Sequence, residues 1–340
     1  MRLLVTGGTG FVGSHSVAAL LGAGHEVRLL VRDSTPVESA LGSRGVGVSD
    51  VVVGDMTDPR AVARAVHGRD AVVHAAALFT FDPRRVASIG ATNVRGTEVV
   101  LEAACNAGCD PVVHVSTFSA LLPRDEALTP DSPVGSIRTH YSRSIAQSDR
   151  VARRWQDEGA PVVITYPGAV MGPHDPHMGE GARLIASILR GQLPFQLNGV
   201  LPIADVRYVA AGHAAAMKSG RGPRRYLLTG IDTPGGELAA ALRRVTGRRL
   251  IALPSPQGIT LAAAKLADML QRIAPVRLPL SYEAAYIPTS MPRAGTDHSR
   301  TREELGVSPP PLEHTLRDTI AWLVAAGHLS ANAAGRSAVP

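Results

Sequence analysis

A glycine-rich turn follows the first apolar run of the chain, and it constrains the fold more than any other feature. Residues 3–6 read Leu-Leu-Val-Thr, and Gly7, Gly10 and Gly13 follow at every third position. The first two glycines let the backbone turn tightly and approach a pyrophosphate, whereas the third lets a helix pack against the strand. A strand, a glycine turn and a helix in this order open a βαβ unit that binds a dinucleotide. The residues expected to contact the cofactor here are Gly7, Thr9, Gly10, Phe11, Val12 and Gly13.

Short apolar runs rich in valine alternate with longer helical patterns through the first half of the chain. Such alternation is typical of right-handed βαβ units, and near-continuous hydrophobicity indicates strands that are covered on both faces. The expected strands are residues 3–6, 26–31, 51–53, 71–74, 112–115 and 162–165, with helical spacing over 83–107 and 141–158. We therefore predict an α/β fold, a doubly wound parallel sheet of the Rossmann type.

After Gly172 the pattern loosens, because proline and glycine punctuate short elements. Helices are expected over residues 182–190, 237–245, 260–273 and 312–326. We predict three parts: residues 1–172 form the cofactor-binding Rossmann domain, residues 173–328 form a smaller mixed α/β substrate lobe, and residues 329–340 form a disordered tail. Some segments of the lobe are expected to return to the sheet domain.

The residue after the second expected strand bears on the choice of cofactor. An acid at this place binds the ribose hydroxyls of NAD, whereas a basic residue neutralises the 2′-phosphate of NADP. The chain has Val31 followed by Arg32, with Asp33 one residue later. We expect NADP(H) to be favoured over NAD(H), although Asp33 could reach the ribose and Arg32 could be an exposed loop charge.

Composition and charge exclude several classes of partner. No apolar run approaches the roughly 20 residues of a membrane helix, and the net charge of +6 comes from scattered arginines, so neither a membrane nor nucleic acid is expected. The first strand begins at residue 2 and leaves no room for a signal peptide, which favours the cytoplasm. Cys105 and Cys109 lack a zinc spacing, and residues 174–177 (HDPH) supply too few ligands, so no metal is expected.

Several ordered motifs together resemble the extended short-chain dehydrogenases/reductases. They are TGGTGFVGSH at 6–15, GDMTD at 54–58, HAAA at 74–77, NVRGT at 93–97, HVST at 114–117 and YPGAVMGP at 166–173. The chain is most similar to the branch of dihydroflavonol reductases, 3β-hydroxysteroid dehydrogenases and bacterial members of the NAD-dependent epimerase/dehydratase family. Arg32 and the segment DHSRTREELG at 297–306 add to this likeness.

The resemblance implies an NAD(P)-dependent oxidoreductase and assigns roles to residues. Tyr141 matches the catalytic tyrosine, and Thr117 matches the residue that hydrogen-bonds the substrate oxygen, with Ser116 as its alternative if the alignment shifts by one. The resemblance also implies cofactor contacts: Asp55 and Met56 near the adenine, Ala75, Ala76 and Ala77 along the cofactor, and Pro167 to Val170 by the nicotinamide carboxamide.

The chain departs from the family pattern four residues after the tyrosine. The family has a lysine there, and this spacing puts both side chains on one helix face, where the ammonium favours tyrosinate and holds the nicotinamide ribose. This chain has Ile145 instead, and its only lysines are Lys218 and Lys265. A phenol with an ordinary pKa of about 10 is then harder to ionise. Arg143 lies about 200° round the helix from Tyr141, and we do not expect it to replace the lysine.

Three functions remain open on this basis. The first is NADPH-dependent reduction of a carbonyl group, or the reverse alcohol oxidation, with Tyr141 as the proton donor. The second is a non-redox reaction on the same fold, such as a dehydration, isomerisation or cyclisation. The third is a cofactor-binding protein that is not an enzyme. The retained Tyr141 and Thr117 favour an enzyme, and reduction suffers least from the missing lysine because a neutral phenol already carries the proton.

A small hydrophobic substrate is expected from apolar side chains that follow the strands or open the second lobe. They are Phe79, Phe81, Leu121, Met171 and Met178, for which core packing is the alternative interpretation. Nucleotide-sugar enzymes share the motifs and hold a diphosphate with basic residues of the second lobe, for which Arg183 and Arg190 are the candidates. The resemblance is also compatible with a homodimer through two helices of the sheet domain.

Overall fold

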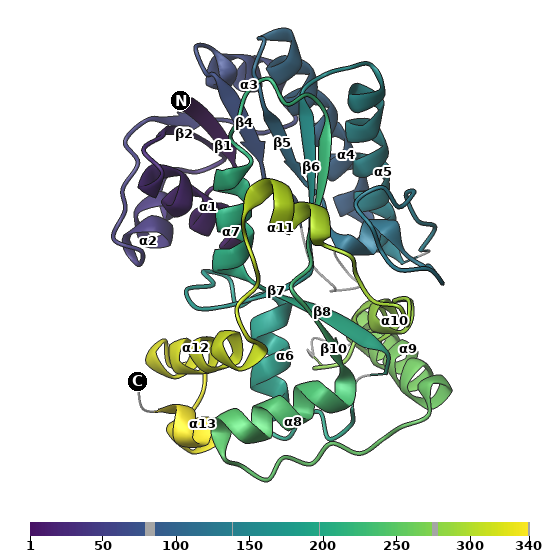
Figure 1. Ribbon diagram of the computed structural model, residues 1–340. Helices are drawn as coiled ribbons and strands as arrows, with labels where there is room; N and C mark the ends of the chain where they lie inside the picture. Colours follow the sequence, from purple (N-terminus) through teal and green to yellow (C-terminus); the bar gives the residue numbers. More distant parts are fainter. Residues whose placement is uncertain (79–85, 138, 197, 274–277, 339–340) are drawn as a thin grey trace.

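The computed structural model describes residues 1–78, 86–137, 139–196, 198–273 and 278–338, and its main feature is a seven-stranded parallel sheet (Figure 1). The strands lie in the order β3 (Val51–Val53), β2 (Glu26–Val31), β1 (Arg2–Thr6), β4 (Ala71–His74), β5 (Val112–Val115), β6 (Val162–Pro167) and β9 (Arg224–Leu228). The chain runs outward from β1 to one edge and then returns to β4 on the other side of β1. This reversal is the topological switch point of a doubly wound sheet, and it confirms the predicted Rossmann fold.

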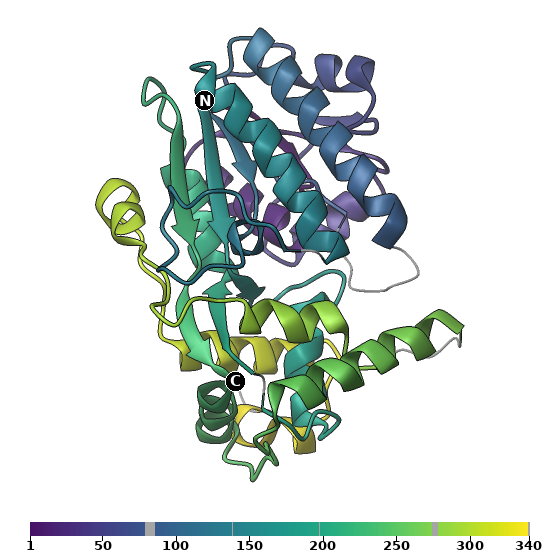
Figure 2. The same cartoon turned by 90° about the vertical axis from the view of Figure 1, so that its right-hand side faces the viewer.

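Alternate residues of each strand enter opposite cores, as the twofold repeat of a strand requires. Leu4 of β1 packs on one face, and Leu3 and Val5 pack on the other. The first face is covered by α3 (Pro59–Val66), α4 (Val86–Asn106) and α5 (His140–Asp157). The second face is covered by α1 (Phe11–Gly22), α2 (Pro36–Gly42), α7 (Val206–Ala215) and α11 (Ser299–Leu305). Figure 2 shows α4 and α5 side by side on the first face.

The second lobe is built on a small three-stranded sheet. Its strand order is β10 (Ile231–Pro234), β8 (Val200–Asp205) and β7 (Ala169–Met171), with β7 parallel and β10 antiparallel to β8. The helices of this lobe are α6 (Glu180–Leu189), α8 (Gly235–Thr246), α9 (Gln257–Ile273), α10 (Tyr282–Thr289), α12 (Leu312–Ala325) and α13 (Ala331–Ala334). Two short 3₁₀ helices complete the described elements, η1 (Phe118–Leu121) and η2 (Gly335–Ala338).

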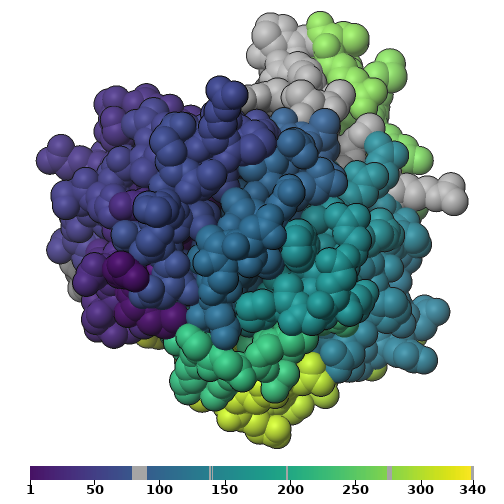
Figure 3. Space-filling model, turned by 90° about the horizontal axis from the view of Figure 1, so that it is seen from above, coloured from purple at the N-terminus to yellow at the C-terminus, as the bar shows by residue number. Residues whose placement is uncertain are grey.

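Parts of the chain beyond residue 172 return to the large sheet. Strand β9 pairs with β6, and α7 packs against α1. The turn before β9 also joins this domain, because Ser219 and Gly220 donate hydrogen bonds to Asp110 at 2.8 and 2.7 Å. Seen from above, this green segment lies against the blue and teal surface of the first half (Figure 3). The division at residue 172 remains a proposal about the chain, with these segments assigned to the Rossmann layer.

The expectation of a disordered tail over residues 329–340 is wrong for the residues that the structure describes. Residues 331–338 form α13 and η2. The Ser337 hydroxyl is buried and donates to the Val245 carbonyl at 3.1 Å, and the Arg248 guanidinium donates to the Ala333 carbonyl at 2.6 Å. Small and polar residues fold here because the neighbouring helix α8 and the turn after it supply hydrogen-bond partners.

Candidate active site

The glycine turn after β1 is packed too tightly for any other residue. Gly7 has a φ of +74°, and a Cβ built on it would lie 2.7 Å from the Ala76 Cα. A Cβ on Gly13 would lie 2.0 Å from the Gly7 carbonyl oxygen. The Gly10 amide donates to that same oxygen at 2.9 Å, which closes the turn. The turn, the start of α1 and the segment after β4 are therefore held together by backbone contacts that only glycine permits.

This arrangement fits a dinucleotide pyrophosphate. Helix α1 begins at Phe11 after Gly10, which has no side chain to cap the first amides. The free N–H groups of the first turn and the positive end of the helix dipole favour an anion. The Ala75 and Ala76 amides are tied to the end of β1, because they donate to the Thr6 carbonyl at 3.2 Å and the Thr6 hydroxyl at 3.3 Å. Ala75 and Ala76 therefore lie beside the turn, and the contact of Ala75 to Ala77 with the cofactor stays a prediction.

The ends of β2 and β3 carry the residues expected near the adenosine. Arg32 and Asp33 are exposed directly after β2, and Asp33 Oδ1 accepts from the Thr35 amide at 2.9 Å and its hydroxyl at 2.8 Å. The Asp55 carboxylate likewise accepts from the amide and the hydroxyl of Thr57. These hydrogen bonds lower the pKa of Asp55, and the nearby charge of Arg32 lowers it further. Both acids are thus engaged by their own turns, whereas Arg32 extends into solvent beside Asp55.

Met56, the other residue expected near the adenine, lies against α4. A Cβ built on Gly96 would lie 2.7 Å from the Met56 sulfur. The thioether is partly buried, and it therefore forms an apolar wall next to the Asp55 turn. Sulfur and methyl groups at such a place suit the flat face of a base.

The ends of β5 and β6 bring together the residues expected at the reacting end. Thr117 is half-buried directly after β5, and its hydroxyl donates to the Pro167 carbonyl at 3.5 Å. Ser116 is 8% exposed, so its hydroxyl is the less accessible of the two. Val170 lies two residues beyond Gly168, in β7, which pairs with β8. Of the two hydroxyls, that of Thr117 is therefore the more accessible.

Tyr141 lies in the first turn of α5, and this helix packs against η1 directly after Thr117. Burial raises the pKa of Tyr141, and the negative charge of Glu283 raises it further. Ile145, one turn along the same helix, is 5% exposed and packs as an apolar side chain. Arg143 is exposed, and the side chain of His140 lies outside the described residues. The phenol of Tyr141 therefore keeps its proton at neutral pH.

The start of α5 is capped from the second lobe, by a residue that the sequence patterns do not indicate. Thr139, at the N-cap position, makes no side-chain bond to the helix amides. The Glu283 carboxylate of α10 accepts instead, from the Ser142 amide at 2.9 Å and the Tyr141 amide at 3.3 Å. It also accepts from the Thr139 hydroxyl at 2.7 Å. Tyr141 and Glu283 are 142 residues apart in the chain, so local spacing gives no signal of this contact.

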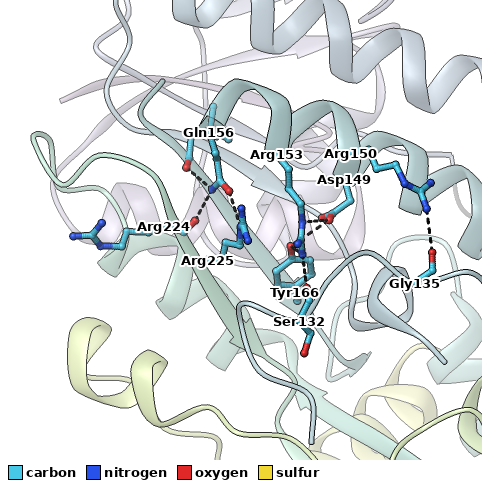
Figure 4. A network of polar contacts seen from close by, with 10 residues as sticks. Ser132, Gly135, Asp149, Arg150, Arg153, Gln156, Tyr166, Arg224 and Arg225 are labelled. Carbon is cyan, nitrogen blue, oxygen red and sulfur yellow. Dashed lines mark hydrogen bonds and ion pairs between the residues drawn. The ribbon is translucent and has the colours of Figure 1, made fainter. Parts of the chain in front are cut away.

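The middle of α5 contains a buried ion pair that is hydrogen-bonded to Tyr166 of β6. Arg153 Nε and Asp149 Oδ2 lie 2.8 Å apart, with side-chain exposures of 13% and 0%. The Arg153 guanidinium also donates to the Tyr166 hydroxyl at 2.8 Å and the Ser132 carbonyl at 2.9 Å. Figure 4 shows Asp149 and Arg153 of α5 directed at Tyr166 of β6. Helix α5, and Tyr141 with it, is thereby held in one place against the sheet.

The residues expected to contact the substrate are only partly brought to this site. Leu121 and Met171 are 0% and 1% exposed and pack within hydrophobic cores, which gives them a packing role. Met178 is partly buried at the start of the second lobe, with an unusual φ of 47°. Phe79 and Phe81 lie outside the described residues.

The basic residues proposed for a diphosphate are engaged elsewhere. Arg183 pairs with Glu180 at 3.0 Å, and Arg190 donates to the His328 carbonyl at 2.5 Å. In the HDPH loop, the Asp175 carboxylate accepts from the amides of His177 and Gly179. Among the described residues, no three His, Cys, Asp or Glu side chains gather as a metal site. Of the helices that the structure describes, none is long and apolar enough to cross a membrane.

Known proteins share this fold and sequence over nearly the whole chain. Sterol demethylase protein B of Methylococcus capsulatus is 30% identical over 95% of this chain and 98% of its own. A Synechocystis protein provisionally named dihydroflavonol 4-reductase is 29% identical over 96% of this chain and 95% of its own. The crystal structure of gox2253 is 28% identical, with a TM-score of 0.78 over 97% of this chain and 99% of that one.

The family assignment rests on the nucleotide-binding half together with these relatives. The model of the NAD dependent epimerase/dehydratase family matches residues 3–228, which include the glycine turn, Thr117 and Tyr141. The names of the family and of its relatives are those of NAD(P)-dependent oxidoreductases and dehydratases of the short-chain type. With its doubly wound sheet, the chain belongs to the NAD-dependent epimerase/dehydratase family.

Proposed function

We propose that the protein reduces a carbonyl group of a small hydrophobic substrate with NADPH, and that Tyr141 donates the proton. The neutral state of Tyr141 carries this proposal. Burial, the Glu283 carboxylate and the isoleucine at 145 all disfavour tyrosinate. Tyr141 is therefore a poor base for an alcohol near neutral pH, whereas it is suited to act as the acid in the reverse direction.

In the proposed reaction the chain's own residues bind and protonate the oxygen of the substrate. The bound cofactor supplies the hydride, which forms the new C–H bond at the carbonyl carbon. The Thr117 hydroxyl donates a hydrogen bond to the carbonyl oxygen and polarises it. The Tyr141 phenol then transfers its proton to that oxygen, and solvent reprotonates the tyrosine.

A preference for NADP(H) is proposed from the end of β2. Arg32 is exposed there, and the neighbouring carboxylate of Asp33 is already bound by Thr35. A free guanidinium pairs well with a phosphate, whereas an acid on the ribose would repel the 2′-phosphate. The relatives do not decide this preference, because solved members of the fold such as MoeE5 are in complex with NAD.

Replacing Arg32 tests the preference directly. We expect Arg32→Ala to raise the Kd for NADPH by about 10- to 100-fold, since a charge-assisted hydrogen bond is worth about 1.5–3 kcal/mol. The Kd for NADH should change little, and Arg64→Ala, an exposed arginine of α3, is the matched control. Both constants can be measured by quenching of protein fluorescence. Equal losses for the two cofactors would remove Arg32 from phosphate recognition.

A hydrophobic ring ketone is the proposed substrate class. Two observations support it: Arg183 and Arg190, the candidates for a sugar diphosphate, are bound to other groups of the protein, and relatives include a sterol demethylase protein and a 2-alkyl-3-oxoalkanoate reductase. The homodimer expected from the family resemblance stays a prediction.

The deciding experiment follows NADPH oxidation by the native protein over a panel of ketones and aldehydes that includes hydrophobic ring compounds and sugars. Tyr141→Phe, Ile145→Lys and the apolar control Ile145→Met are assayed beside it. We expect native protein and Ile145→Met to reduce a ring ketone, and Tyr141→Phe to lose about 10²- to 10⁴-fold in kcat. Activity of Ile145→Lys alone would identify a disabled reductase and favour a non-redox reaction.

A further inference from the structure

We propose that Glu283 is the positioning residue for Tyr141: from the second lobe, it sets the place of the first turn of α5. This inference rests on the proposed function, in which Tyr141 is the proton donor. It assigns to the lobe a part in the chemistry beyond binding of the substrate.

The contacts of Glu283 are all directed at one helix turn. Its side chain is 7% exposed, and Oε1 accepts from the Thr139 hydroxyl at 2.7 Å, the Ser142 amide at 2.9 Å and the Ser142 hydroxyl at 3.2 Å. Oε2 accepts from the amide of Tyr141 itself at 3.3 Å. A single carboxylate thus accepts four hydrogen bonds from Thr139, Tyr141 and Ser142, including one from the backbone of the tyrosine itself.

The location explains why a carboxylate is suited to this role. The first amides of a helix have no partner within the helix, and the helix dipole adds positive potential there. The local N-cap, Thr139, donates its hydroxyl to Glu283 and does not cap the amides. The cap that would ordinarily come from the preceding residue therefore comes from α10. Without it, the first turn of α5 would lose its restraint, and Tyr141 is in that turn.

Helix α10 is itself anchored firmly enough to act as a reference. Ile287, together with Met291 just after the helix, is buried in the core that also contains Val151 of α5. At its start, α10 is capped by Ser281, and the Tyr282 amide donates to Asp268 of α9 at 3.2 Å. Glu283 thus stands between the helices of the second lobe and the reacting tyrosine. A movement of α9 or α10 would be transmitted to Tyr141 through this carboxylate.

Two substitutions separate the hydrogen bonds of Glu283 from its bulk. Glu283→Gln keeps one acceptor oxygen of similar shape, whereas Glu283→Ala removes both. We expect Glu283→Ala to lower kcat for ketone reduction by about 10- to 100-fold, because small misplacements of a catalytic group have costs of this order. The Kd for NADPH should stay within about twofold of native, since the glycine turn is untouched. Glu283→Gln should recover most of kcat, and Glu303→Ala, exposed on α11, is the matched control.

Hydrogen exchange of the peptide covering residues 139–146 gives a readout that needs no substrate. We expect exchange to speed up by about 5- to 30-fold in Glu283→Ala, the range that corresponds to loss of a helix cap. Thr139→Val, which removes one donor to the carboxylate, should give a smaller increase. An increase in exchange that is confined to this peptide, with the rest of α5 unchanged, supports the inference.

The two readouts distinguish failure of this inference from failure of the proposed function. Unchanged exchange in Glu283→Ala overturns the positioning role, even where the native protein reduces ketones. Faster exchange with an unchanged kcat also overturns it, because the turn would then move without effect on the proton donor. If the native protein reduces no ketone, the proposed function fails, and exchange still decides whether Glu283 holds the turn.

Discussion

At the scale of single residues, Ile145 stands where the family pattern has a lysine, and this difference bears on how easily Tyr141 ionises. The helix still places the two positions one turn apart, and Ile145 is buried. An ammonium there would lower the pKa of the phenol by opposite charge, whereas isoleucine leaves burial and Glu283 to raise it. The same geometry therefore holds a proton donor where the family pattern has a residue that is readily ionised.

A pH profile tests this reading of Tyr141. Because the pKa of the phenol is raised, its protonated form persists to high pH, and kcat for reduction should stay flat from pH 6 to about 10. Ile145→Lys should introduce a decline on the alkaline side within this range, since the cation favours tyrosinate. Ile145→Met should keep the flat profile. A decline of kcat in the native enzyme that begins near pH 7–8, by about tenfold per pH unit, would contradict the assignment.

Gly13 is a residue of the glycine turn whose substitution should be poorly tolerated. Its Cβ would lie 2.0 Å from the Gly7 carbonyl oxygen, a backbone atom that cannot move without opening the turn. We expect Gly13→Ala to abolish NADPH binding and to lower the Tm. Gly22→Ala, at the end of the same helix with nothing within 4 Å, should instead stabilise the protein by about 0.5–1 kcal/mol. Calorimetry and fluorescence titration of both variants measure the contrast.

At the scale of elements, local patterns predict the strands of the first half and the helices α6, α8, α9 and α12 of the second half, but not the strands of the second half. The strands of the large sheet up to β6 are apolar runs of four to six residues, or a valine triplet in β3, and each is found within two residues of its predicted end. Strands β7 to β10 are missed, because they are short or mixed, as in Ile231–Pro234. Their pairing depends on partners far along the chain, such as β9 on β6.

The candidate site shows the same division. The glycine turn can be predicted, because it stands between a strand signal and a helix signal, whereas the roles of Thr117 and Tyr141 are implied only by the family resemblance. Glu283 cannot be predicted from local patterns, since the only sign of its role is a contact between residues that are 142 positions apart. The core positions of Leu121 and Met171 are also invisible in the sequence, because an apolar side chain after a strand serves a core and a substrate equally well.

The ion pair within α5, which is hydrogen-bonded to Tyr166 of β6, gives a prediction at this scale. Arg153→Met leaves the Asp149 carboxylate buried and unpaired, and we expect it to destabilise the protein by about 3–5 kcal/mol. The double variant Asp149→Leu/Arg153→Met removes both charges and should regain most of that loss. Urea unfolding of the three proteins provides the comparison. A double variant no more stable than Arg153→Met would show that the network stabilises through its hydrogen bonds to Tyr166 and Ser132.

At the scale of the whole molecule, the sheet is crossed by neutral, buried histidines that make the fold sensitive to acid. Burial lowers the pKa of His74 to about 3 and of His114 to about 4, and the two rings face each other from β4 and β5 at 5.6 Å. Burial also lowers the pKa of His213 to about 4, and its ring is bonded to the hydroxyls of Ser16 and Thr165. These groups link β4, β5, β6, α1 and α7.

The sign of the effect follows from the two states of each histidine. In the unfolded chain the ring binds a proton near pH 6.5, whereas in the folded protein it does so only near pH 3–4. The free energy of unfolding should therefore be highest above pH 6.5 and should fall between pH 6.5 and 4, by on the order of 2 kcal/mol for each histidine. Urea titrations at several pH values measure this slope.

The variant His114→Leu should make the slope shallower, because it removes a buried ring whose nitrogens have no hydrogen-bond partner among the described residues. The control His67→Gln, at an exposed histidine, should leave the slope unchanged. A slope that is the same in His114→Leu would show that carboxylates, rather than this buried pair of rings, govern the acid unfolding of the sheet.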